Sequence, residues 1–156
     1  MELLKCALYV FLIGIATQFA GQALPRQWFD PDSSLFRQRS WEKGGNFYRK
    51  IRIRKWKHKL PDASKHSKKM YRKAVSTTPD AENLERMVQE TCVAEFVHIL
   101  LIILSLGVIK IWKGRQGWIC WLLCFLGNLP FILIQRFNRP RLQSALERLQ
   151  VKDTIP

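Results

Sequence analysis

The chain has 156 residues, of which 47% are hydrophobic, and its 26 lysines and arginines outnumber its 12 acidic residues to give a net charge of +14. The apolar residues fall into three blocks with the basic residues between them, which is typical of a membrane protein and unlike a soluble globular domain. A nucleic-acid binder can be equally basic but needs no apolar blocks, and no groove-reading motif is present, so we expect no nucleic-acid partner. The four cysteines form no CxxC pair, which favours neither a zinc site nor a disulfide framework.

The first block runs from Leu3 to Leu24 and, at about 1.5 Å per residue, is long enough to cross a bilayer. We therefore predict that residues 1–24 form an N-terminal transmembrane helix or signal anchor. A cleaved signal peptide is the alternative, because Gly21 and Ala23 suit a small-residue cleavage site, although Glu2 cancels the charge of its amino-terminal region. The sequence leaves open whether this segment is removed.

Residues 25–92 form a basic loop in which tryptophan, phenylalanine and tyrosine alternate with arginine and lysine. Such a mixture suits the headgroup region, where aromatic rings settle at the interface and each cation near anionic lipid contributes about 1 kcal/mol. We predict an amphipathic, interfacial loop. Near its end, Thr78, Pro79 and Asp80 make a helix-start signal, and the helix that follows is expected to place Leu84, Met87, Val88 and Thr91 on one face.

The second and third blocks, Val93–Ile109 and Trp118–Ile134, are predicted to form a transmembrane helical hairpin over residues 93–135. Because seventeen residues is the low end for a span, a re-entrant pair is the alternative. Pro130 is expected to kink the last helix and Pro140 to stop it, which leaves residues 136–156 as a basic tail.

The positive charges near the block ends predict the orientation. Ten of them lie on the side of the loop and tail, against Lys5, Lys110, Lys113 and Arg115 on the other side. The positive-inside rule then places the loop and the C-terminus in the cytoplasm. The predicted fold class is an all-α, multi-pass protein of the cell membrane with about three transmembrane helices.

Polar residues at the start of the second block form the first candidate site. Glu95 and His98 are three residues apart and share a helix face, and Glu90 lies about a turn and a half earlier. Ionisable groups inside a span usually face a polar cavity or a partner. The alternative is that Glu95 reaches the headgroups and His98 bonds to a neighbouring helix. Since the Glu-x-x-His motif occurs once, a di-iron site is not indicated and we expect no metal.

A second candidate lies in the stretch that begins at Trp56, where His58 is followed four residues later by Asp62. This HxxxD arrangement occurs in several acyl-transfer enzymes, where the histidine removes a proton from an acceptor hydroxyl. The alternative is chance, because residues 25–92 hold 17 lysines and arginines and a nearby His and Asp arise easily.

A third candidate combines Asn128, inside the last block, with polar residues at its end. These are Arg136, Asn138, Arg139 and Arg141. The arginines can be a positive-inside anchor. Alternatively, their forked guanidiniums can grip a phosphate or carboxylate at the membrane surface.

These segments carry a resemblance to a known family. The stretches WKHKLPD, ETCVAEFVH and NLPFILIQRFNRPRL, with SWEKGGNFYRK upstream, resemble the glycosyl-diaponeurosporenoate acyltransferases from about Pro25 to Leu146. The resemblance implies an enzyme that esterifies a fatty acyl chain onto the primary sugar hydroxyl of a glycosylated C30 carotenoid, the final step of staphyloxanthin-type pigment synthesis. It implies no cofactor, only an activated acyl donor such as acyl-CoA or acyl carrier protein as co-substrate.

Ester formation needs a base, an oxyanion stabiliser and a surface for the donor. The base is expected to be His98, oriented by Glu95, or His58, supported by Asp62, and we favour His98. The expected substrate-binding residues are Trp56, Asn128, Arg136, Asn138, Arg139 and Arg141. The expected partners are the bilayer, the glycosyl carotenoid, the acyl donor and other pigment enzymes. A non-enzymatic scaffold for those enzymes is the alternative function, and the sequence leaves open the acyl chain, the exact carotenoid and the oligomeric state.

Overall fold

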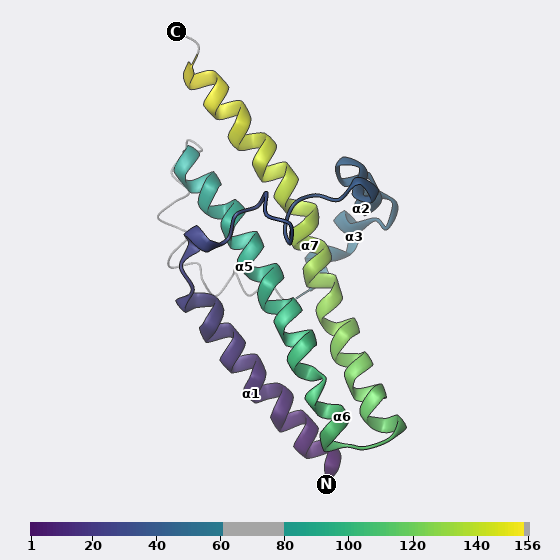
Figure 1. Cartoon of the computed structure of the whole chain (residues 1–156). Coiled ribbons are helices and arrows are strands. Elements are labelled where there is room, and N and C mark those ends of the chain that lie inside the picture. Colours follow the sequence, from purple (N-terminus) through teal and green to yellow (C-terminus); the bar gives the residue numbers. More distant parts are fainter. Residues whose placement is uncertain (61–79, 155–156) are drawn as a thin grey trace.

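Three long helical stretches lie side by side in the computed structural model, which describes residues 1–60 and 80–154 (Figure 1). They are α1 (Glu2–Ala23), α5 (Ala81–Ser105) continued by α6 (Gly107–Ile111), and α7 (Arg115–Thr154). Within the described ranges all three are long and apolar enough to cross a membrane, and there is no strand. The prediction of an all-α membrane protein with about three spans is confirmed.

The helices alternate in direction, so the chain has two unlike ends (Figure 1). The amino terminus and the short α6–α7 turn lie at one end. The end of α1, the start of α5 and the carboxyl end of α7 lie toward the other. The predicted helical hairpin is therefore present, and its second helix extends well beyond the apolar block.

Helix α5 begins where the sequence predicts. Asp80 is the N-cap, and its side chain accepts a hydrogen bond from the backbone N–H of Glu82 at 3.3 Å. Of the expected face, Val88 and Thr91 are buried and Leu84 is half-buried, but Met87 is exposed. The helix therefore starts well before the apolar block and carries polar residues into the bundle.

The prediction that Pro140 ends the last helix is wrong. Helix α7 runs unbroken from Arg115 to Thr154 with Pro130 and Pro140 inside it, so the expected tail is its last turns. A proline in a helix interior removes one backbone hydrogen bond and costs about 3 kcal/mol. Around Pro140 that cost is offset by Arg136 and Arg139, whose side chains bond to the loop and to α5.

Helix α1 packs against α5 and α6 as an integral member of the bundle. Tyr9 donates a hydrogen bond to the Leu104 carbonyl at 2.8 Å. At the other end, Gly21 lies so near α5 that an added Cβ would sit 2.6 Å from Cγ2 of Val97. Small residues permit this close approach of membrane helices.

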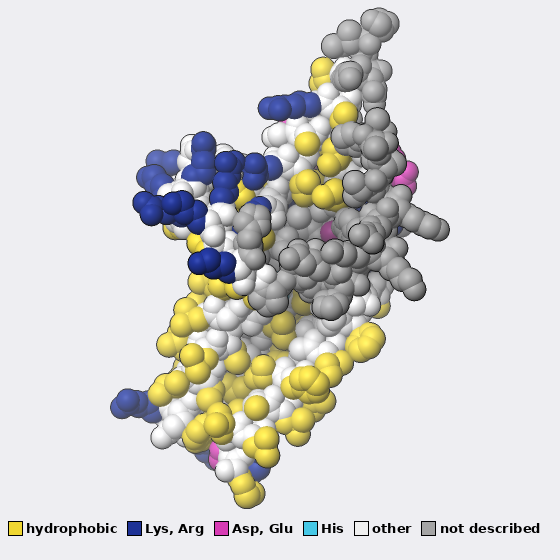
Figure 2. All heavy atoms as spheres, turned by 180° about the vertical axis from the view of Figure 1, so that it is seen from behind, with side chains coloured by type: hydrophobic (Ala, Val, Ile, Leu, Met, Phe, Trp, Pro, Cys, Tyr) yellow, Lys and Arg dark blue, Asp and Glu magenta, His cyan; other side chains and the backbone are white. Residues whose placement is uncertain are grey.

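The first part of the loop folds into short helices at one end of the bundle. These are η1 (Arg26–Trp28), η2 (Ser40–Gly45), α2 (Asn46–Lys50), α3 (Ile53–Trp56) and η3 (Lys57–Lys59). Phe29 and Phe36 pack on α5, and Tyr48 and Ile53 pack on Phe137 of α7. Figure 2 shows lysine and arginine side chains gathered on residues 40–59, here called the basic lobe, with hydrophobic side chains covering the body below.

Candidate functional site

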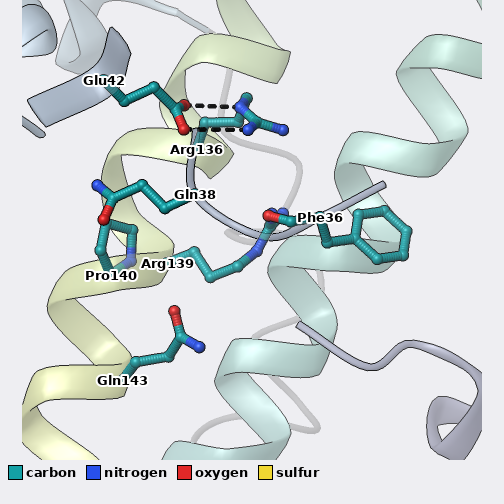
Figure 3. A pocket seen from close by; sticks show the side chains of 7 residues that line it. All are labelled: Phe36, Gln38, Glu42, Arg136, Arg139, Pro140 and Gln143. Carbon is teal, nitrogen blue, oxygen red and sulfur yellow. Dashed lines mark hydrogen bonds and ion pairs between the residues drawn. The ribbon is translucent and has the colours of Figure 1, made fainter. Parts of the chain in front are cut away.

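Four charged side chains meet between the loop, α5 and α7, three of them buried and Arg136 partly exposed. We call them the charge cluster: Glu42, Glu95, Arg136 and Arg139. Arg136 bonds to Glu42 at 2.8 Å through Nε and to Glu95 at 2.7 Å through Nη1. Arg139 bonds to the second oxygen of Glu95 at 2.5 Å. Figure 3 shows the guanidinium of Arg136 facing the carboxylate of Glu42. With two positive and two negative charges, the cluster is neutral as a whole.

The same two arginines hold three consecutive carbonyls of the loop. Arg136 donates to the carbonyls of residues 35 and 37 at 3.4 and 3.2 Å, and Arg139 donates to that of residue 36 at 2.7 Å. Arg139 also donates to the hydroxyl and carbonyl of Thr91. Every guanidinium nitrogen of both arginines therefore has a partner within the protein. Neither is free to bind a phosphate without breaking the cluster.

Glu42 stays ionised in this setting. Burial by itself raises the pKa of Glu42, but hydrogen bonds from Arg136, Tyr48 and the backbone N–H of Arg39 outweigh it and hold the pKa below its ordinary value. The pKa of Tyr48 is raised, by burial first and then by the neighbouring Glu42, so its hydroxyl remains a neutral donor. Sequence reasoning missed both residues. Glu42 could have been noticed as the one carboxylate in residues 41–60, among eight lysines and arginines.

A small pocket opens beside the cluster, with an empty volume of about 190 Å³ (Figure 3). It is lined by Phe36, Gln38, Glu42, Arg136, Arg139, Pro140 and Gln143. Part of that volume is open to solvent and the enclosed part has room for about one water molecule, so this pocket is too small to enclose a sugar. The cluster is best understood as the joint that fastens the loop to α5 and α7.

A second polar contact lies deeper in the bundle, between His98 and Asn128. Nδ1 of His98 lies 2.8 Å from Oδ1 of Asn128, and the imidazole stacks on Phe131 with ring centroids 4.7 Å apart. The amide nitrogen of Asn128 donates to the carbonyl of Cys124 at 2.8 Å, which turns the amide oxygen toward the imidazole. Since that oxygen only accepts, Nδ1 must carry the proton. Nε2 is left with its lone pair, ready to accept a proton.

The structure separates two residues that the sequence suggested would pair. Glu95 was expected to orient His98, but its carboxylate bonds to Arg136 and Arg139, and His98 bonds to Asn128 instead. A carboxylate forms stronger hydrogen bonds with guanidinium ions than with a neutral imidazole, so the arginines take it. Asn128, expected to bind substrate, is the residue that orients His98.

The HxxxD hypothesis remains a prediction. The backbone of His58 lies in η3, and Asp62 lies outside the described residues. Trp56, the third residue expected there, donates from its indole nitrogen to the Ile51 carbonyl at 3.1 Å and packs against the cluster that contains Phe137. Its contacts within the described part of the chain are those of a packing residue.

The two remaining expected residues lie on α7. Arg141 is exposed, and its guanidinium carbon lies 5.0 Å from the ring centroid of Phe137. Asn138 is half-buried. In residues 1–60 and 80–154, no three His, Cys, Asp or Glu side chains gather as metal ligands.

Comparison with known proteins identifies the family. The model of the glycosyl-4,4'-diaponeurosporenoate acyltransferase family matches residues 25–148, which include both the charge cluster and the His98–Asn128 pair. The chain belongs to the glycosyl-4,4'-diaponeurosporenoate acyltransferase family. The predicted resemblance is confirmed. As a member of this family, the protein is an enzyme, an acyltransferase of carotenoid pigment synthesis with membrane-spanning helices.

Relatives that carry the same family name align with most of this chain. The glycosyl-4,4'-diaponeurosporenoate acyltransferase of Staphylococcus aureus strain MRSA252 is 32% identical over 148 residues, which cover 93% of this chain and 88% of the relative. The acyltransferase of strain Newman is 31% identical over 150 residues, covering 94% of this chain and 89% of the relative. No solved structure matches.

Proposed function

We propose that this acyltransferase esterifies a fatty acyl chain onto the primary sugar hydroxyl of a glycosylated C30 carotenoid, with His98 as the general base. The donor is an activated acyl thioester, acyl-CoA or acyl carrier protein. The observation that carries the assignment is the contact of Asn128 with Nδ1 of His98, because it leaves Nε2 as a proton acceptor. The names of the relatives support the carotenoid acceptor.

The reaction follows from that geometry. Nε2 of His98 takes the proton of the sugar hydroxyl while the hydroxyl oxygen attacks the thioester carbonyl. The new C–O bond forms, the C–S bond breaks, and the imidazolium returns its proton to the leaving thiolate. Asn128 holds the ring and accepts from Nδ1–H throughout, the part that the third member plays in catalytic triads.

The depth of His98 suits a lipid-borne acceptor. It lies three residues beyond Glu95 on α5, about 4.5 Å further into the bundle, among apolar residues of α5 and α7. Asn138 is ten residues beyond Asn128, about 15 Å along α7. It is therefore too far away to stabilise an oxyanion formed at His98, and we assign it no part in this mechanism.

The loop and the carboxyl end of α7 are proposed to face the cytoplasm, where activated acyl donors are made. The excess of lysine and arginine at that end supports this orientation. The charge cluster then lies near the inner membrane surface and fastens the loop above His98.

The test is acyl transfer by the purified protein. Protein in detergent is mixed with the glycosyl carotenoid and either acyl-CoA or acylated carrier protein, and the product mass is measured. We expect the pigment to gain one fatty acyl group with at least one donor, and His98→Ala to abolish the gain. Folded wild-type protein that transfers no acyl group from either donor would contradict the proposal. If His58→Ala and not His98→Ala abolishes transfer, the base is His58.

A further inference from the structure

Two cations lie against one buried aromatic ring where the basic lobe meets α7. Nζ of Lys57 is 5.3 Å and the guanidinium carbon of Arg141 is 5.0 Å from the centroid of Phe137. Phe137 is 3% exposed and packs with Tyr48 and Ile53, so the ring is fixed. Cation–π contact with a shared rigid ring holds the two charges in place.

These two cations have no anionic partner among the residues that the structure describes. Within the described residues neither Lys57 nor Arg141 forms an ion pair, and Glu42, the one carboxylate of residues 41–60, is committed to Arg136. The pKa of Lys57 is lowered by burial and then by the nearby charges of Arg141 and Arg54. An anion placed between the cations would relieve that repulsion.

The contrast with Arg136 and Arg139 is direct. Those arginines have all their nitrogens bonded within the protein. Arg141, two residues beyond Arg139 on α7, is exposed and keeps its donors available. Lysine and arginine together are the usual ligands of phosphate groups.

We propose that Lys57 and Arg141, flanked by Arg54, bind a phosphate group at the membrane surface. Resting on the proposed function, we assign this site to the phosphate of the donor's 4′-phosphopantetheine arm. Arg141 lies thirteen residues beyond Asn128, about 20 Å along α7. An extended pantetheine arm covers a distance of that order, so a phosphate bound here would place the thioester near His98. The phosphate of a lipid headgroup offers the same chemistry.

Binding of coenzyme A and of pantetheine, which lacks the phosphates, tests the proposal in a maltoside detergent that carries no phosphate. We expect wild-type protein to bind coenzyme A more tightly than pantetheine. Lys57→Gln and Arg141→Gln should each weaken coenzyme A binding about tenfold and leave pantetheine binding unchanged. Lys55→Gln on α3 and Arg148→Gln on α7 remove the same charge from exposed positions and serve as matched controls. Thermal unfolding confirms that each variant is folded, and Arg141→Lys should keep most of the affinity.

A parallel titration with phosphatidylglycerol separates the two phosphate sources. Lipid binding that depends on Lys57 and Arg141, with no coenzyme A binding, supports the phosphate site and assigns it to a headgroup. Equal weakening by the control variants, or binding of neither coenzyme A nor phosphatidylglycerol by wild type, overturns the site. Because these measurements need no turnover, coenzyme A binding without acyl transfer would contradict the proposed function and leave the site standing.

Discussion

The charge cluster and the His98–Asn128 pair both lie between α5 and α7, yet they differ in how completely their polar groups are bonded. Glu95 and His98 are three residues apart on α5, and their partners lie on α7. In the cluster every charge is neutralised and every arginine nitrogen is bonded. In the pair the groups are neutral, and only one imidazole nitrogen has a partner within residues 1–60 and 80–154.

The difference teaches that a polar group inside a membrane helix is not by itself a reactive group. Buried charges are tolerated only when paired and hydrogen-bonded, and this saturation leaves them nothing with which to bind a substrate. A neutral imidazole costs less to bury and can keep one nitrogen for chemistry. Stability and reactivity should therefore respond to different substitutions.

The largest effect we expect is on stability, from Glu95→Gln. This substitution leaves Arg136 and Arg139 with one anionic partner between them, and breaking a buried ion pair costs about 3–5 kcal/mol. Thermal unfolding in detergent should show a large loss. Glu85→Gln, at an exposed position on the same helix, should change little. An unfolding midpoint for Glu95→Gln equal to that of wild type, with acyl transfer abolished, would make the cluster part of the chemistry.

Asn128→Ala should show the opposite pattern. The imidazole loses the acceptor that fixes its orientation, and misplacement of a catalytic group costs roughly 10²-fold in rate. We expect kcat to fall with little change in the KM for the donor and little change in the unfolding temperature. Asn138→Ala, about 15 Å away along α7, is the control. If both asparagine variants lose the same activity, the orienting role of Asn128 is wrong.

Gly21→Ala should affect neither region directly. An added Cβ would press on Val97 of α5, and overpacking of this kind costs about 1–3 kcal/mol. We expect lower stability but an unchanged rate per folded molecule. Gly14→Ala, which meets open space on the same helix, adds the same methyl group without a clash and should not lower stability. A rate loss with Gly21→Ala alone would show that α1 shapes the site.

The smallest effect we expect is a pH dependence of the loop. The pKa of Glu42 is held below its ordinary value. The ion pair of Glu42 therefore stabilises the fold fully at pH values above the ordinary pKa of glutamate, and this stabilisation is lost as the pH falls through the lowered pKa. The loop should remain attached at pH 5 and loosen only below about pH 4. Fluorescence of Trp41, which packs on Phe47 and Tyr48, reports this transition. Loosening at pH 6, or an unchanged transition in Glu42→Gln, would rule out Glu42 as its cause.

Much of the fold could be predicted because it follows from local pattern. The lengths of the apolar blocks predicted the three spans, and the capping residue Asp80 predicted the start of α5. The end of α7 could not be predicted from Pro140, because the cost of a proline in a helix was offset by the contacts of Arg136 and Arg139 with distant residues. Such contacts depend on the fold and leave no local signal.

The sequence pointed to individual residues of the site but not to which of them bond to one another. Glu95, His98 and Asn128 were singled out because polar groups in apolar helices need a reason. The spacing of Glu95 and His98 on α5 suggested that these two residues pair. Nothing local indicated that two arginines of α7 bind Glu95 instead, or that Glu42 joins them. Lys57 was hidden among the many cations of the basic lobe, and only its shared ring with Arg141 distinguishes it.

The most direct measurement is the single-turnover rate of acyl transfer by His98→Asn, with the folded fraction measured on the same sample. Asparagine places an amide N–H where Nδ1–H lies, so it can keep the hydrogen bond to Asn128 but cannot act as the base. Loss of a general base should lower the rate about 10²- to 10⁴-fold, while the unfolding temperature stays near that of wild type. A rate within a few fold of wild type would contradict the account.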